Sequence, residues 1–337
     1  MSNHDPQKLH EQLIQALAPK YRFGGDETLE QWQAKARNAL RLRLGLDEIP
    51  ACESQPEILW RREEAEFTEI RFSLETEPGY DSLMHLLLPK MGNPKPPVVI
   101  CLQGHSTGMH ISLGRPKFAE DEEDIAGDRD YAIQAVRRGY AALTLEQRAF
   151  GECGGNEKGP RCAHPAATAL LLGRTLIGER VHDIMQAVTL LRSGYFDVDP
   201  ERIAVTGNSG GGTASIYAAA MDPRIAASMP SCAFTSYYAS IVVGLHCMCN
   251  YIPGIAKDFD MGDLCALIAP RPLVVIAAKQ DTSFPLEQAL EQFEVTKAAY
   301  SAANALDKCR LLAAPGGHRY YASLAWPAFD ELTAWRK

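Results

Sequence analysis

An apolar run at residues 203–205 leads directly into a glycine-rich turn at residues 207–211, and a run of small residues follows. The turn reads Gly-Asn-Ser-Gly-Gly, which fits the pattern G-x-S-x-G, and this pattern between a strand and a helix is typical of a nucleophilic serine. Glycines have no Cβ, so they let the strand and the helix approach closely while the serine occupies a strained turn. The N-terminus of the next helix would direct backbone N–H groups toward a developing negative charge. The sequence therefore predicts Ser209 as a nucleophile and the N–H of Gly210 as a donor to an oxyanion.

The same glycines partly fit phosphate-binding loops, but each of these alternatives lacks a required residue. Gly207 and Gly212 have the spacing of G-x-x-x-x-G, yet Thr213 follows where such a loop needs lysine. Gly210 and Gly212 begin a G-x-G-x-x-G, yet Ser215 stands at the third glycine position. A nucleophile turn is therefore favoured over a phosphate loop or an ordinary glycine-rich turn.

A nucleophilic serine of this kind needs an acid and then a histidine later in the chain, and both are present. Asp281 follows an expected strand at residues 272–278, and His318 follows the last expected strand at residues 309–315. His318 would take the proton of Ser209 and pass it to the leaving group, while Asp281 would orient the imidazole and stabilise its charged form. The alternative for Asp281 is a helix cap. The order Ser, Asp, His predicts a catalytic triad.

A second oxyanion donor is expected where the first central strand ends, at residues 98–105. The simplest donor in that loop is the backbone N–H of His105, paired with the N–H of Gly210. The alternative is that Gly104 and His105 form an ordinary turn.

Strand and helix patterns alternate along most of the chain, which predicts an α/β fold with a mostly parallel sheet and helices on both faces. Strands are expected at residues 98–105, 140–146, 202–207, 224–230, 272–278 and 309–315, and helices at 130–138, 166–192, 213–221, 286–300 and from 321 onward. Residues up to about 60 look helical, with Thr28 or Asp26 as a cap and Gly45 just past the end of one helix. We therefore expect an N-terminal helical extension, residues 1–64, and a catalytic domain, residues 65–337.

With these motifs in order, the chain resembles the α/β-hydrolase superfamily over roughly residues 65–337. The run at residues 198–211 is similar to the acetyl xylan esterase, cephalosporin deacetylase and dienelactone hydrolase-like groups of serine esterases. The resemblance implies hydrolysis of carboxylic esters through an acyl-enzyme, without a cofactor, and Ser209, Asp281 and His318 match the triad positions. The chain departs from these groups at Gln103, where a histidine is usual, and at residues 146–151, where their Arg-Gly-Gln signature is missing.

Charge and composition exclude several classes of partner. The chain of 337 residues has 34 Lys and Arg against 42 Asp and Glu, a net charge of −8, so no basic field is expected to attract nucleic acid or an anionic membrane. Residues 225–256 carry no charged side chain, but Pro230, Gly244 and Pro253 interrupt them, so they do not form a membrane span. Nine cysteines, sparse and odd in number, and a first segment without a signal-peptide pattern predict a cytoplasmic protein.

Two groups of cysteines and histidines lie close together in the sequence: Cys153, Cys162 and His164, and then His246, Cys247 and Cys249. Neither group has the paired spacing that is typical of structural zinc sites, so the sequence predicts no metal site and leaves the role of both groups open.

The uncharged segment after residue 230 is where this fold adds residues of the acyl pocket, so Tyr237, His246 and Tyr251 are candidate pocket residues. Packing in the core or in a lid is the alternative for them.

The expected substrate is a small ester with a short acyl chain, such as an acetylated carbohydrate. A lactone, dienelactone or peptide is the alternative on the same triad, and a non-catalytic binding protein on a hydrolase scaffold is the alternative from another class. A homo-oligomer is also compatible with the sequence.

Overall fold

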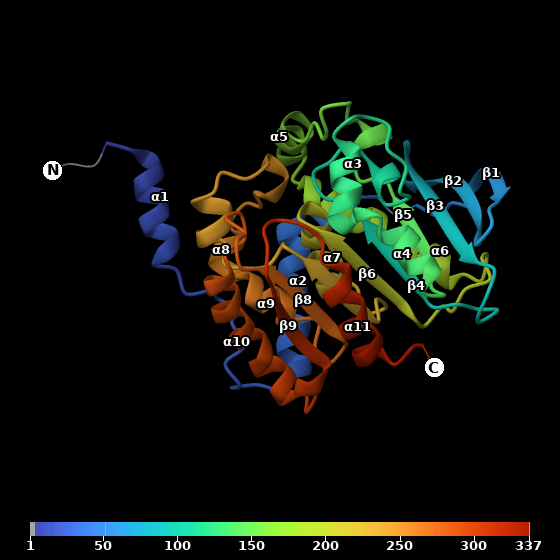
Figure 1. Cartoon of the computed structure of the whole chain (residues 1–337). Helices are drawn as coiled ribbons and strands as arrows, with labels where there is room; N and C mark the ends of the chain where they lie inside the picture. The colour runs from blue at the N-terminus through green and yellow to red at the C-terminus, as the bar shows by residue number, and fades with distance from the viewer. Residues whose placement is uncertain (1–3, 51, 337) are drawn as a thin grey trace.

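Nine strands of the described residues form one twisted sheet in the computed structural model, which describes residues 4–50 and 52–336 (Figure 1). Their order across the sheet is β1-β2-β3-β5-β4-β6-β7-β8-β9. The first pairs, up to β3 with β5, are antiparallel, and every pair from β5 to β9 is parallel. The strands are β1 (Glu57–Glu63), β2 (Phe67–Glu77), β3 (Tyr80–Pro89), β4 (Val98–Leu102), β5 (Ala141–Leu145), β6 (Ile203–Asn208), β7 (Ala227–Ser231), β8 (Leu273–Ala278) and β9 (Cys309–Ala314).

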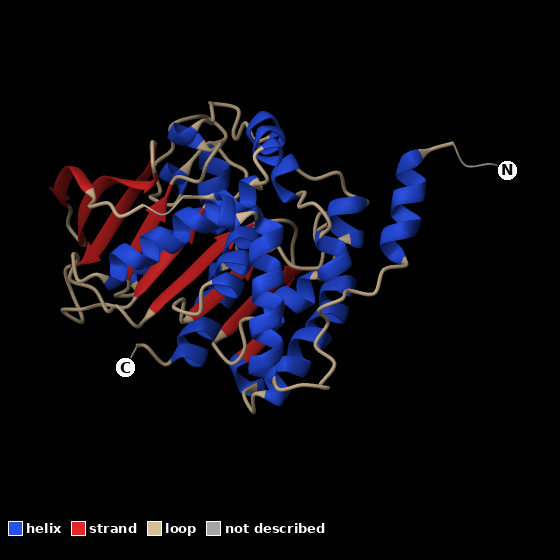
Figure 2. Ribbon diagram, turned by 180° about the vertical axis from the view of Figure 1, so that it is seen from behind, coloured by secondary structure: helices blue, strands red, loops and turns tan. Residues whose placement is uncertain are grey.

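Helices cover both faces of this sheet, as predicted. The helices are α1 (Pro6–Gln15), α2 (Leu29–Leu44), α3 (Asp121–Asp124), α4 (Tyr131–Arg137), α5 (Ala163–Leu171), α6 (Leu176–Arg192), α7 (Gly210–Met221), α8 (Ile255–Asp258), α9 (Met261–Ala266), α10 (Leu286–Ala302) and α11 (Ala322–Thr333). Alternate residues of β4 face opposite sides, so Ile100 packs with α2, α6 and α7, and Val99 packs with α4 and α11 (Figures 1 and 2). The central strands are apolar throughout because both of their faces are buried. None of the helices in the described ranges is both long and apolar enough to cross a membrane.

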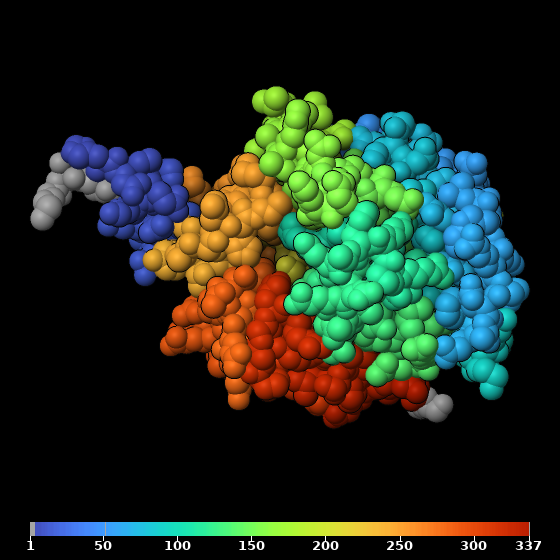
Figure 3. Space-filling view, turned by 45° about the horizontal axis from the view of Figure 1, so that its top comes forward, coloured from blue at the N-terminus to red at the C-terminus, as the bar shows by residue number. Residues whose placement is uncertain are grey.

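The N-terminal region is only partly helical. Its second helix, α2, packs into the core, whereas its first helix, α1, does not. Thr28 caps α2, Gly45 ends it with a φ of 71°, and Trp32 is buried against the body of the protein. By contrast α1 lies at the edge of the molecule and presents exposed leucines, Leu9 and Leu13 (Figures 1 and 3). The boundary at residue 64 and the homo-oligomer stay predictions.

Two expectations about secondary structure are wrong. The segment expected to be helical up to about residue 60 contains the start of β1, an edge strand that is mostly exposed and therefore has no buried apolar pattern. The single helix expected at residues 166–192 is two helices, because Gly173 adopts a φ of 73° and Thr175 caps α6 by accepting a hydrogen bond from the N–H of Gly178 at 3.0 Å. The break brings the first turn of α6 against the end of α2, where Gly178 leaves no room for a Cβ beside the Leu44 carbonyl oxygen.

A buried ion-pair network ties the loop after β5 to α6 and β2. The guanidinium of Arg148 donates two hydrogen bonds of 2.9 Å to Asp183 and one of 2.9 Å to Glu77. Asp183 is fully buried, and Arg174 also binds Glu77. Residues 146–151, where the esterase signature was missing from the sequence, therefore contribute a side chain that holds the sheet to its covering helix.

We expect the substitution Arg148→Met to lower the free energy of unfolding by about 3–5 kcal/mol, because it leaves the Asp183 carboxylate buried without its partner. Urea denaturation followed by circular dichroism measures this change. The matched control is Arg137→Met, which breaks an exposed ion pair with Glu66 and is expected to change stability by less than about 1 kcal/mol. Equal losses in the two variants would contradict a special role for the buried network.

Candidate active site

The serine turn has the backbone geometry that its glycines suggested. Ser209 lies between the end of β6 and the start of α7 with φ 54° and ψ −124°, a conformation that a residue with a Cβ rarely adopts. A Cβ on Gly211 would lie 1.9 Å from the carbonyl oxygen of Leu102, and one on Gly207 would lie 2.4 Å from the same oxygen. Only glycine fits at these two positions, so α7 can begin directly against β4 and hold the serine above the sheet.

Asp281 and His318 are hydrogen-bonded to each other. His318 Nδ1 lies 2.8 Å from Asp281 Oδ2, and Oδ1 of the same carboxylate accepts the backbone N–H groups of Ser283 and Phe284 at 2.9 and 3.1 Å. Burial alone would raise the pKa of Asp281, but the hydrogen bonds and the charge of His318 hold that pKa below its usual value. The carboxylate is fully buried, whereas 28% of the His318 side chain is exposed. This hydrogen bond fixes the orientation of the His318 ring.

The backbone around Ser209 and that around His318 are joined through β7. The N–H of Ser209 donates to the Ser231 carbonyl oxygen at 3.0 Å, and the Ser231 hydroxyl donates to the Arg319 carbonyl oxygen at 3.2 Å. All of these residues lie at the carboxyl ends of neighbouring parallel strands, where α/β sheets place their sites. Figure 3 shows a hollow on this face, between the red C-terminal residues, the orange segment near residue 250 and the green loop around α3.

The loop after β4 packs directly against the serine turn. A Cβ on Gly104 would lie 2.7 Å from the carbonyl oxygen of Asn208 and 3.1 Å from Ser209 Cβ, and one on Gly210 would lie 2.8 Å from ring atoms of His105. The two backbone segments that carry the expected oxyanion donors, those of His105 and Gly210, are therefore neighbours. His105 and His318 both line a cavity of about 770 Å³.

With the fold and this geometry established, sequence comparison gives the family. The model of the Abhydrolase family matches residues 6–310. The chain belongs to this family. The match begins at the first residue of α1 and ends at the second residue of β9, so it covers the N-terminal helices and most of the sheet but not the segment that carries His318.

Relatives and solved structures agree with this assignment. The chain is 26% identical over 234 residues to YtaP of Bacillus subtilis (strain 168), a protein assigned as a hydrolase, and the match covers 68% of this chain and 76% of YtaP. A Bacteroides fragilis protein assigned as an acetyl xylan esterase superposes with a TM-score of 0.81 at 18% identity, covering 98% of this chain and 96% of that one. A glucuronoyl esterase from Solibacter usitatus gives a TM-score of 0.70 at 16% identity, with coverages of 95% and 97%. The α/β-hydrolase fold predicted from the sequence is thereby confirmed.

In this Abhydrolase-family chain, a residue absent from the sequence predictions lies against the histidine. The ring of Phe284 stacks on His318 with centroids 5.8 Å apart and an interplanar angle of 16°, and its edge meets His246 at 5.2 Å. Phe284 follows Asp281 by three residues, and an apolar residue in that polar loop was the sequence signal that could have identified it.

His246, a predicted pocket residue, shares a hydrogen bond of 2.9 Å with Ser240 Oγ. Burial lowers the pKa of His246, so its neutral form is favoured.

The other two candidate pocket residues line a different cavity. Tyr237 and Tyr251 face a mainly apolar cavity of about 750 Å³ between α1 and the segment around Ile241. The Tyr237 hydroxyl is hydrogen-bonded to that of Tyr217, and the Tyr251 hydroxyl donates to the Ile241 carbonyl oxygen at 3.0 Å. These contacts place Tyr237 and Tyr251 in the wall that supports α1.

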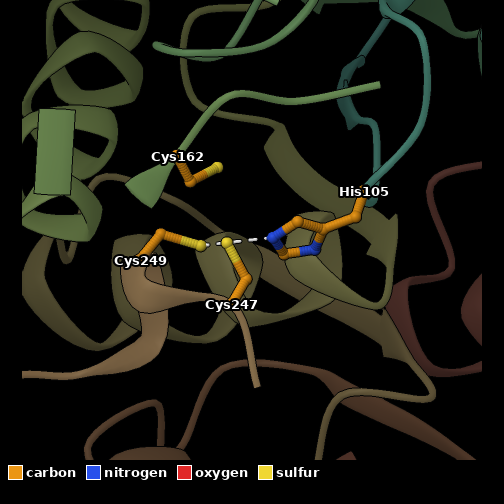
Figure 4. A group of neighbouring side chains, drawn as sticks. All are labelled: His105, Cys162, Cys247 and Cys249. Atoms are coloured by element: carbon orange, nitrogen blue, oxygen red, sulfur yellow. Dashed lines mark hydrogen bonds between the residues drawn. The ribbon is translucent and has the colours of Figure 1, made fainter. Parts of the chain in front are cut away.

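The cysteine and histidine groups seen in the sequence are not the ones that meet in space. The structure brings together one member of the first group, two of the second and a histidine outside both: Cys162, Cys247, Cys249 and His105 (Figure 4). Their sulfur and nitrogen atoms all lie within 4.8 Å of one another. Sequence spacing could not identify this set because His105 and Cys249 are 144 residues apart.

Proposed function

We propose that this chain is a serine hydrolase that cleaves carboxylic esters through an acyl-enzyme, with Ser209 as nucleophile, His318 as general base and acid, and Asp281 as the residue that orients His318. The observation that carries the proposal is the 2.8 Å hydrogen bond between His318 and Asp281 at the same sheet edge as Ser209, which is held at φ 54°. A strained serine turn and an oriented histidine at one sheet edge are the two parts that acyl transfer requires.

In the first half of the reaction, Ser209 Oγ attacks the ester carbonyl carbon while His318 Nε2 takes the serine proton. The carbonyl oxygen becomes an oxyanion, which the backbone N–H groups of His105 and Gly210 stabilise. The bond to the alcohol then breaks, and His318 gives its proton to the departing alkoxide. Water repeats these steps on the acyl-enzyme and releases the acid. Each step uses side chains and backbone of this chain, so the chemistry requires no cofactor.

The cavity favours a small polar ester such as an acetylated carbohydrate. Its lining includes Glu120, Glu123, Lys158 and Arg319 beside His318, and these side chains offer hydrogen bonds to sugar hydroxyl groups. The similarity in fold between this chain and an acetyl xylan esterase and a glucuronoyl esterase supports the same substrate class. We also place the protein in the cytoplasm, since all nine of its cysteines are unpaired.

The proposal is tested by labelling and by a substrate panel. We expect a fluorophosphonate probe to modify the intact protein on the peptide that contains Ser209, as identified by mass spectrometry. We expect p-nitrophenyl acetate and acetylated xylo-oligosaccharides to be hydrolysed faster than p-nitrophenyl decanoate. No labelling and no ester hydrolysis would contradict the proposal in favour of a binding protein. Faster cleavage of aminoacyl amides than of acetyl esters would make the chain a peptidase on the same triad.

A further inference from the structure

We propose that His105, Cys162, Cys247 and Cys249 bind one zinc ion in a tetrahedral site next to the catalytic centre. The four side chains come from three separate segments, and their donor atoms point toward one another (Figure 4). His105 Nε2 and Cys249 Sγ are 3.2 Å apart. Bonds of about 2.3 Å to sulfur and about 2.0 Å to nitrogen place the donor atoms of such a tetrahedral zinc site roughly 3.5–3.8 Å from one another. The observed donor atoms, one pair at 3.2 Å and all pairs within 4.8 Å, need to move by no more than about 1 Å to reach that spacing.

The donor set is one that selects zinc. Three cysteines and one histidine form a common structural zinc site, in which all four positions are taken by the protein. Soft thiolate ligands disfavour magnesium and calcium, which prefer oxygen. Cys162 and Cys249 are 2% and 3% exposed, so an ion held there would be shielded from water on most sides.

A buried arginine supplies an independent reason for negative charge at the cluster. Arg180 is 1% exposed, and in the part of the chain that the structure describes its hydrogen-bond partners are the Arg148 carbonyl oxygen, at 2.8 Å, and Cys162 Sγ, at 3.2 Å, rather than a carboxylate. A buried guanidinium without an anion is strongly unfavourable. Three thiolates, a neutral imidazole and Zn²⁺ together carry a charge of −1, which the charge of Arg180 cancels.

Two arrangements of the cluster without a metal ion, three protonated thiols or a disulfide, account for fewer of these contacts. Three protonated thiols would leave the Arg180 guanidinium without a counter-charge in the interior. A disulfide between two of the cysteines would remove two of the potential negative charges and leave His105 Nε2 with no role at the centre of the group. The hydrogen bond from Arg180 to Cys162 Sγ is the kind of outer contact that commonly orients a metal-bound thiolate.

The site would hold the oxyanion loop in place. The ring of His105 packs against Gly210, and its Nε2 faces the cysteines, so a bond from Nε2 to zinc would fix the residue whose backbone N–H serves as an oxyanion donor. Zinc would not touch the substrate and would act by positioning. This consequence rests on the proposed esterase function, whereas metal binding itself does not.

The first test is the metal content of the intact chain, purified without an affinity tag and under reducing conditions. We expect inductively coupled plasma mass spectrometry to find about one zinc per chain. We expect Co²⁺, exchanged for zinc, to give the visible absorption of a tetrahedral thiolate site. A wild-type protein that carries no stoichiometric metal, and binds neither Zn²⁺ nor Co²⁺ after reduction, would overturn the proposal.

Variants assign the metal to these residues. Cys162→Ala and Cys249→Ala are expected to lose the zinc, while the control Cys265→Ala, a buried cysteine outside the cluster, is expected to keep it. Arg180→Met is expected to weaken zinc binding by about 10–100-fold in a chelator competition, as loss of an outer contact does. Zinc retained by both cysteine variants would overturn the assignment. If these variants do not fold, titration of chelator-treated wild-type protein with Zn²⁺ still shows whether the chain binds one zinc ion.

Activity separates the two proposals. Removal of zinc is expected to lower kcat for p-nitrophenyl acetate by up to about 10²-fold, the value of one oxyanion donor, and added zinc is expected to restore it. Zinc bound at one per chain without esterase activity would leave the metal site standing and contradict the proposed function. Full esterase activity in a protein that binds no zinc would support the function and overturn the metal site.

Discussion

Replacement of Ser209 by alanine is expected to lower kcat for p-nitrophenyl acetate by about 10⁶-fold, because the variant lacks the hydroxyl that forms the acyl-enzyme in the proposed mechanism. Alanine has a Cβ like serine, so the turn at φ 54° should remain as strained as before and the fold should be kept. The loss should therefore appear in initial rates while the circular dichroism spectrum and thermal midpoint stay close to those of the wild type.

The matched control is Ser215→Ala on the same helix. Ser215 is also buried, and its hydroxyl donates to the Gly211 carbonyl oxygen at 2.8 Å, so the variant removes a hydrogen bond without touching the proposed chemistry. Its rate should remain within a few-fold of the wild type. If Ser209→Ala retains a tenth of the wild-type rate or more, the nucleophile is another residue.

The second large effect is expected for Asp281→Asn, with a loss of about 10⁴-fold in kcat. The asparagine carbonyl can still accept the N–H groups of Ser283 and Phe284, so the loop should stay in place. The amide has no charge, so it no longer stabilises the imidazolium form of His318 and no longer favours the tautomer that leaves Nε2 free to take a proton.

Asp260→Asn is the control for this experiment. Asp260 is a half-buried aspartate whose carboxylate accepts the N–H groups of Tyr237 and Met261, both at 2.8 Å, where it caps α9. The variant Asp260→Asn loses the same charge as Asp281→Asn but lies away from His318, so its kcat should change by no more than a few-fold. A loss of only a few-fold in Asp281→Asn, no larger than that of the control, would indicate that His318 works without the Asp281 carboxylate.

The serine turn could be predicted because its determinants are local. The requirement for glycine at positions 207 and 211 arises from close contact with a neighbouring strand, and the glycines themselves are visible in the sequence. Asp281 and His318 could be located because each follows a recognisable apolar strand, and parallel strands bring their carboxyl ends to one edge. The pattern of buried strands was therefore enough to predict that Asp281 and His318 lie close together.

The parts that escaped prediction depend on contacts between distant segments or on weak local signals. Phe284 contacts His318 only because the loops after β8 and β9 fold over each other, which no spacing reveals. Strand β1 is exposed, so its residues do not show the buried alternation of a typical strand. The break before α6 was marked by Gly173 and Thr175, but the apolar residues on both sides continue a helical period across it.

The backbone strain at Ser209 has a consequence for how such a chain evolves. A residue with a Cβ at φ 54° and ψ −124° is less stable by about 1–3 kcal/mol than one in a relaxed conformation, whereas glycine adopts these angles freely. Natural selection for stability alone would therefore favour replacement of this serine, and the proposed role as nucleophile explains why it is retained. A descendant of this lineage that had lost its enzymatic role would be expected to carry glycine here and to be more stable than its active ancestor.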